Sequence, residues 1–194
     1  AETRQLSVLP DVVSFNTVLS SAMRQWRDAL LTLQTMEAES LQISAISINS
    51  VLSASEKSSA WETALLLFST GERGSPDVFG HSATIGACSK VKYWEEALRC
   101  VPSSKKANVV TYGASIKACE EAGRWVQALM NLEELHGCRC QGNVVTYSGA
   151  MAACERTSRW HGSLILFEEM VQQNLRANVV SYGAAVAAAK DWRL

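Results

Sequence analysis

The chain has 194 residues, and its 18 Lys and Arg residues nearly balance its 19 Asp and Glu residues, which leaves a net charge of −1. Since nucleic-acid binders usually carry a basic footprint, this balance argues against a binder that depends mainly on charge. The apolar share of 47% is ample for a buried core. No apolar run approaches the roughly 20 residues that a membrane-spanning helix needs, so we expect no membrane span.

Several repeats in the sequence begin with two apolar residues, a small polar residue and an aromatic residue, as in Val109, Val110, Thr111 and Tyr112. The residue before each opening is of a type that caps a helix N-terminus, so each opening predicts the start of a first helix. These capping residues are Asp11, Ser44, Asp77, Asn108, Asn143 and Asn178. We expect a lead-in segment at 1–11 and a solenoid at 12–194, with repeats at 12–44, 45–77, 78–108, 109–143, 144–178 and a partial one at 179–194.

Five of the six tryptophans recur 31 to 35 residues apart, and each of the five precedes a small residue and a leucine, as Trp125 precedes Ala128 and Leu129. A period in the thirties is the signature of stacked helical repeats. The sequence therefore predicts an all-α fold, an α-solenoid of stacked helix-turn-helix units, with the tryptophan opening each second helix. Pro102 is expected to shorten the second helix of the third repeat. We assign a structural wedge role, between the two helices of a repeat, to Trp26, Trp61, Trp94, Trp125 and Trp160.

Cysteines occupy one slot in three repeats, at Cys88, Cys119 and Cys154, where other repeats carry Ala or Ser. A slot shared with such small residues predicts buried, reduced thiols. Two further cysteines lie in the segment His136-Gly137-Cys138-Arg139-Cys140. This segment lacks the additional ligands that a zinc finger requires.

None of the three histidines shows the spacing of a catalytic triad or of a metal site, and His81 lies in an aromatic slot of the repeat. We therefore expect no enzymatic activity, no metal, no cofactor and no small-molecule ligand.

The openings, the period in the mid-thirties and the closing Asp or Asn resemble the pentatricopeptide repeat. Tetratricopeptide repeats are the rival, but they carry Trp early in the first helix. Members of the resembled family commonly bind single-stranded RNA in plastids or mitochondria, one base per repeat. The resemblance implies that the residue after the aromatic position and the last residue of the repeat read each base.

The implied reading pairs resemble, in chain order, readers of cytosine, uracil, adenine, weakly adenine, and adenine. They are Asn16 with Ser44, Asn49 with Asp77, Ser82 with Asn108, Gly113 with Asn143, and Ser148 with Asn178. The apolar residues that would clamp the bases are Val13, Ile46, Phe79, Val110 and Val145. The residues that would face phosphates are Lys57, Lys90 and Arg156.

Several features weaken the RNA interpretation. Asp and Asn are favoured as helix caps whether or not RNA binds. Glu121 stands where repeat four would carry a basic residue, and Gly113 has no side chain with which to read a base. Five repeats also read few bases.

The sequence therefore favours a non-catalytic protein–protein scaffold, an accessory structural subunit of a large organellar complex such as a ribosome or a photosynthetic complex. The alternative is sequence-selective binding of single-stranded RNA in organellar RNA processing, stability or translation. The expected partners are protein subunits or, in the alternative, single-stranded RNA. We expect a chloroplast or mitochondrial location, although no transit peptide is visible in the chain.

The last segment, Gly183 to Ala189, is small and apolar, which is unlike the polar cap of a solenoid end. We expect further protein or a partner to cover it.

Overall fold

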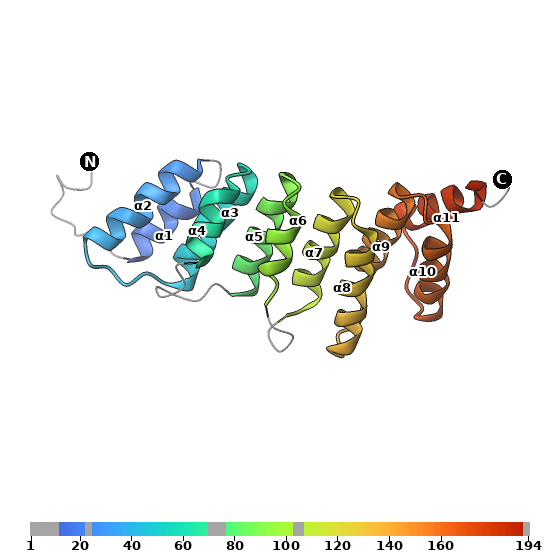
Figure 1. Ribbon diagram of the computed structural model, residues 1–194. Helices are drawn as coiled ribbons and strands as arrows, with labels where there is room; N and C mark the ends of the chain where they lie inside the picture. Colours follow the sequence, from blue (N-terminus) through green and yellow to red (C-terminus); the bar gives the residue numbers. More distant parts are fainter. Residues whose placement is uncertain (1–11, 22–24, 70–76, 103–106, 192–194) are drawn as a thin grey trace. The chain divides into compact units, whose positions relative to one another are not determined.

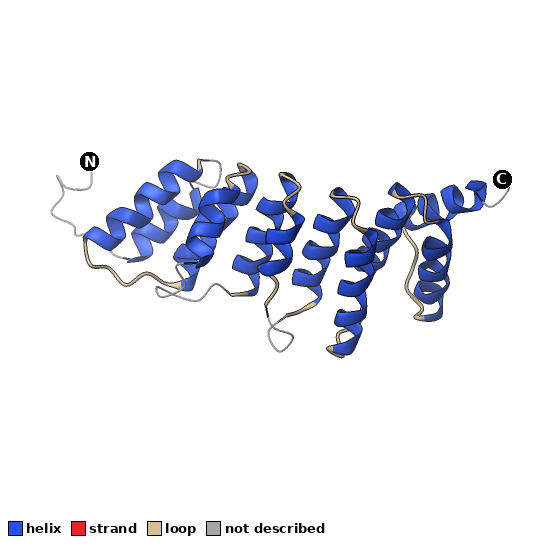
Figure 2. Ribbon diagram, in the orientation of Figure 1, coloured by secondary structure: helices blue, strands red, loops and turns tan. Residues whose placement is uncertain are grey.

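The computed structural model describes residues 12–21, 25–69, 77–102 and 107–191. All regular structure in these residues is helical (Figure 2), so the all-α prediction is confirmed. The predicted lead-in segment at 1–11 and its cap residue Asp11 lie outside the described residues. The helices are α1 (Val12–Ser21), α2 (Trp26–Ala38), α3 (Ala45–Lys57), α4 (Trp61–Ser69), α5 (Val78–Lys90), α6 (Trp94–Arg99), α7 (Val109–Glu121), α8 (Trp125–Gly137), α9 (Val144–Arg156), α10 (Trp160–Gln172) and α11 (Val179–Asp191).

Side-chain caps fix where the first helices begin. Asn108 Oδ1 accepts hydrogen bonds from the backbone N–H groups of Val110 and Thr111, and Thr111 Oγ1 accepts one from the Asn108 N–H. Ser44 and Asn143 form the same reciprocal capping box. Asp77 caps α5 and Asn178 caps α11 through their Oδ1 atoms. The predicted capping role is thereby confirmed for each of these residues.

A tight turn joins each first helix to the second helix of its repeat. In α7 the N–H of Arg124 donates to the carbonyl of Cys119, and Gly123 between them has a positive φ of 68°. The same long backbone bond reaches the carbonyls of Ser55, Cys88 and Cys154. This is the Schellman ending, in which one left-handed residue reverses the chain. In α4, α6, α8 and α10 the tryptophan that starts the second helix therefore follows the left-handed residue by two positions.

The described chain packs as two units, residues 1–87 and 88–194. In the first unit, α1, α2 and α3 contact one another and α4 packs on α3. In the second unit, α9 contacts α7 and α11, while α8 and α10 pack against these first helices (Figure 1). Stacked helical hairpins of this kind are the packing of an α-solenoid. The single solenoid domain over 12–194 stays a prediction.

The tryptophans are half-buried at the start of each second helix. Trp26, Trp61 and Trp125 pack against buried clusters, and Arg159 of the next repeat lies 5.1 Å from the Trp125 ring. The residue three positions later is fully buried in every repeat, at Ala29, Ala64, Ala97, Ala128 and Ser163. A small residue there lets the helices approach closely, and the wedge role of the indoles stays a prediction.

Pro102 has the predicted effect on the third repeat. Helix α6 has only 6 residues, whereas α8 and α10 have 13 each. Proline lacks the N–H that would continue the helix, and it disfavours helical geometry at the residue before it.

Helix α11 has an exposed apolar face, where the end of a solenoid usually carries polar residues. Val179, Tyr182 and Val186 are all more than half exposed. Tyr182 occupies the position that Tyr112 and Tyr147 occupy in their repeats, where α8 and α10 help to bury them. That a partner or further chain covers this face stays a prediction.

The thiols fall into two classes, which predicts their reactivity. Cys88, Cys100, Cys119 and Cys154 are buried, whereas Cys138 and Cys140 are half-buried. Burial raises the pKa of Cys88 and of Cys119 to about 11, so little thiolate forms there near pH 8. With iodoacetamide at pH 8, mass spectrometry of the folded protein is expected to show two fast adducts, at Cys138 and Cys140. Modification of Cys119 at a comparable rate would contradict the packing.

Candidate nucleic-acid interface

An exposed apolar residue stands at the second position of every described first helix. Such side chains contribute nothing to the core, and exposed apolar residues at one repeated position mark a contact surface. They include each residue to which the resemblance assigns base clamping, with exposed fractions of 55% to 74%. These are Val13, Ile46 and Phe79 in the first unit and Val110 and Val145 in the second. We call these five residues the clamp positions.

The reading pair of repeat one is brought together by a shared serine. Ser47 Oγ donates to Asn16 Oδ1 at 2.8 Å and also lies 3.1 Å from Ser44 Oγ, with which it forms the capping box of α3. Asn16 and Ser44 therefore lie on either side of one hydroxyl. The pair of repeat four is similarly close, because a Cβ atom at Gly113 would lie 3.8 Å from Thr146, the capping partner of Asn143.

Repeat two contains a polar atom without a partner. Asn49 Oδ1 is buried, and no group in the described residues donates a hydrogen bond to it. Asp77, the other member of the pair, is exposed, and its Oδ1 atom accepts from the N–H groups of Phe79 and Gly80. A buried acceptor without a donor destabilises a fold by about 1–3 kcal/mol. The stability of the fold therefore does not explain why position 49 is an asparagine.

The serines assigned to reading differ in exposure. Ser82 is half-buried and Ser148 is buried, and each hydroxyl donates to a carbonyl of its own helix. Asn108 and Asn178 use their Oδ1 atoms as caps. Since Oδ1 accepts these bonds, the amide Nδ2 is the group left to donate to a ligand.

The basic residues assigned to phosphate contacts are exposed. Lys57, Lys90 and Arg156 lie in the last turns of α3, α5 and α9. In repeat four the corresponding Glu121 accepts a hydrogen bond from Ser89 at 2.7 Å. Glu121 is thus held by a structural contact, and the assignment of the three basic residues to phosphates stays a prediction.

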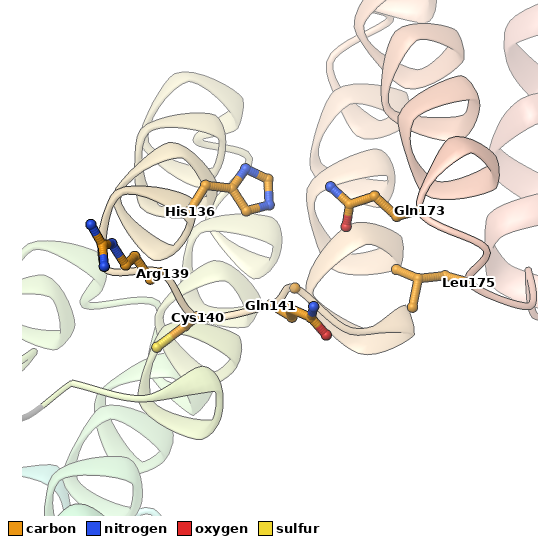
Figure 3. A pocket seen from close by; sticks show the side chains of 7 residues that line it. His136, Arg139, Cys140, Gln141, Gln173 and Leu175 are labelled. Atoms are coloured by element: carbon orange, nitrogen blue, oxygen red, sulfur yellow. The ribbon is translucent and has the colours of Figure 1, made fainter.

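A pocket that the sequence does not indicate lies between the ends of α8 and α10. It has a volume of about 440 Å³, and His136 and Gln173 face each other across it (Figure 3). His136 Nε2 and Glu169 Oε1 lie 3.1 and 3.0 Å from the buried Tyr147 hydroxyl. Burial, followed by the hydrogen bond to Glu169, raises the pKa of Tyr147. The phenol therefore stays protonated and ties two neighbouring repeats together.

Cys140 lines this pocket, whereas Cys138 belongs to a different contact. Cys138 Sγ lies 3.6 Å from the Tyr112 hydroxyl, while His136 contacts Tyr147. Within the described ranges, no group of three or more His, Cys, Asp and Glu residues is arranged to hold a metal ion. None of the helices described is long and apolar enough to cross a bilayer.

The stacked hairpins with capped first helices define the class of fold as an α-solenoid. Similarity to solved structures then identifies the type of repeat. The maize pentatricopeptide repeat protein PPR10 matches with a TM-score of 0.70 and 24% identity, over 98% of this chain and 28% of that chain. PPR10 in complex with an 18-nt psaJ RNA element matches with a TM-score of 0.72 and 20% identity, over 96% of this chain and 29% of that chain. The chain therefore has the fold of pentatricopeptide repeat proteins, and it spans under a third of the length of these structures. No protein-family model and no curated protein matches the sequence.

One residue of the candidate interface is missing from the sequence-based assignment. Val180, at the second position of α11, is also more than half exposed. Its place in the Val179-Val180-Ser181-Tyr182 opening is the signal that identifies it. The Tyr147 contacts with His136 and Glu169 carry no such signal, because they join residues at unrelated positions of the repeat.

Proposed function

We propose that this protein binds single-stranded RNA along the N-terminal turns of its first helices. The observation that carries the proposal is the exposed apolar side chain at each clamp position. Single-stranded nucleic acid offers flat base faces that pack against aromatic and apolar side chains. The likeness of the fold to PPR10, which has been solved with an RNA element, supports the proposal.

The hydrogen-bonding groups beside the clamp positions suit the edges of bases. Asp77 offers only acceptors, which match the N3–H donor of uracil. Asn108, Asn143 and Asn178 offer amide donors, which match acceptors such as N1 of adenine. We extend the proposal to RNA processing, stability or translation in a chloroplast or mitochondrion.

The sequence alone favours a protein scaffold over RNA binding. Two further observations instead support RNA binding over a scaffold. An exposed apolar residue recurs at the same position of each first helix, and the matching fold is that of a protein solved with RNA.

Fluorescence polarisation with a labelled RNA that contains C-U-A-A-A tests the proposal. We expect binding that is weaker for an RNA of unrelated sequence. Three phosphate contacts predict a slope of log affinity against log salt of about −2. Equal affinity for all RNA sequences, or no binding at low salt, would refute sequence-selective RNA binding.

Replacing Asn49 by alanine is expected to separate function from stability. The change removes a buried acceptor that lacks a donor and introduces a better helix former, so the free energy of unfolding should rise by about 0.5–1 kcal/mol. RNA affinity should instead fall about tenfold through loss of a base contact. Urea unfolding and polarisation measure the two effects, and a variant that loses stability while keeping its RNA affinity would show a purely structural role.

A further inference from the structure

A second repeated set of exposed apolar residues lies on the second helices, away from the clamp positions. Leu31, Leu66, Met130 and Ile165 each lie five residues after the tryptophan of their repeat, and each is more than half exposed. In α6 the same position is Arg99. An aliphatic residue that stays exposed at one register is not needed for packing, and such a surface commonly contacts another molecule.

In the second unit, glutamates accompany these residues. Met130 is followed three and four positions later by Glu133 and Glu134, and Ile165 by Glu168 and Glu169. Residues at these spacings share a helix face, so each aliphatic side chain lies beside two acids. The same face of α8 carries Val126, which is also exposed. Neither α8 nor α10 contains a lysine or an arginine.

Side chains from the C-terminal halves of the two helices meet. His136 of α8 lies 3.8 Å from Glu169 of α10, and both contact the hydroxyl of Tyr147. Glu133, Glu134 and Glu168 remain exposed. We call Val126, Met130, Ile165 and these three glutamates the acidic outer face.

Helix stability does not account for these charges. The glutamates lie in the C-terminal halves of α8 and α10, and the helix dipole disfavours negative charge in the last turn of a helix. RNA phosphates and anionic lipid surfaces would both be repelled by these four glutamates, which have no lysine or arginine on their own helices. The occupant must therefore be cationic, and the aliphatic residues require that it also be apolar.

We propose that the acidic outer face binds a basic amphipathic helix of a protein partner. Leucine-type side chains of the partner cover Val126, Met130 and Ile165, while its lysines or arginines pair with Glu133, Glu134 and Glu168. An amphipathic helix supplies both groups at matching spacing, since its apolar stripe and its charged flank recur every three to four residues. This surface is separate from the clamp positions, so RNA and protein can be held at once.

The methionines of the chain allow a direct test with a synthetic probe. We would titrate the full chain, labelled with ¹³C at the methionine methyl groups, with a helical peptide that carries leucines on one face and lysines on the other. Met130 is the exposed reporter, while Met36, Met151 and Met170 are fully buried references. We expect the Met130 methyl signal to shift, and the signals of the buried references to stay in place.

Variants decide whether the apolar and acidic groups both matter. Affinity for the labelled peptide, measured by polarisation, should fall about tenfold in M130S/I165S and again in E133Q/E134Q/E168Q. The equally exposed pair L31S/L66S is the matched control and should bind as the parent does. A peptide with glutamates in place of the lysines should not bind.

Three outcomes would overturn the proposal. The first is an unshifted Met130 signal. The second is peptide binding that M130S/I165S leaves intact, which would show charge attraction without docking. The third is a Met130 shift caused by single-stranded RNA, which would assign this face to nucleic acid.

Discussion

Replacing Tyr147 by alanine is expected to lower the free energy of unfolding by about 4 kcal/mol. The Tyr147 ring is fully buried, and its hydroxyl contacts Glu169 at 3.0 Å and His136 at 3.1 Å. The change leaves a cavity in the core of the second unit and removes a contact that joins two neighbouring repeats. Urea unfolding followed by circular dichroism measures the loss.

Tyr182 provides the matched control for this prediction. It occupies the same position of the repeat in α11 but is 58% exposed, whereas Tyr147 is 0% exposed. Replacing it by alanine should lower the free energy of unfolding by less than about 1 kcal/mol. Similar losses in the two variants would show that α8 and α10 do not bury Tyr147 in the way described.

Replacing Ile46, Phe79, Val110 and Val145 together by serine is expected to weaken RNA binding at least about 100-fold. Loss of one base-stacking contact weakens binding by about 1–3 kcal/mol, and four clamp positions are removed. The side chains are exposed, so each substitution should change the free energy of unfolding by no more than about 0.5 kcal/mol. Polarisation and thermal unfolding of the same samples measure the two effects.

The pair M130S/I165S serves as the control for the clamp positions. Met130 and Ile165 are as exposed as the clamp residues but lie on the second helices, so their loss should leave RNA affinity unchanged. If both sets of substitutions weakened RNA binding equally, apolar exposure in general, and not its place on the first helices, would explain the binding.

The two proposals assign different ligands to different helices. In the first proposal RNA follows the N-terminal turns of the first helices, where caps and clamp positions lie, and in the second a basic protein helix binds the acidic outer face of α8 and α10. A molecule with both surfaces unites the scaffold and RNA-binding interpretations of the sequence. The four glutamates of α8 and α10 contribute to the near-neutral charge of the chain.

The parts of the fold that depend on local chemistry can be predicted from the sequence. Asn108 and Asn143 cap their helices because the side chain and the backbone N–H groups it accepts from are at most three residues apart. The tryptophans mark the second helices, and Pro102 marks the short one, for equally local reasons.

Contacts between distant residues could not be predicted in this way. Nothing near Asn16 in sequence indicates that Ser47, 31 residues later, donates to it. The burial of Ser148 and the unpartnered Asn49 Oδ1 depend on how neighbouring helices pack. The acidic outer face was also missed, because helical spacing identifies the residues of a face but does not decide whether that face is covered.

The specificity of an Asp77→Asn variant tests base reading most directly. Asn and Asp cap helices equally well, so the variant should fold as the parent does while exchanging an acceptor for a donor at the reading position. Affinities would be measured for two RNAs that differ only by uracil or cytosine at the base assigned to repeat two. We predict that the parent prefers uracil about tenfold and that the variant moves the preference to cytosine, whose N3 accepts a hydrogen bond. An unchanged preference would contradict the claim that this solenoid reads RNA bases.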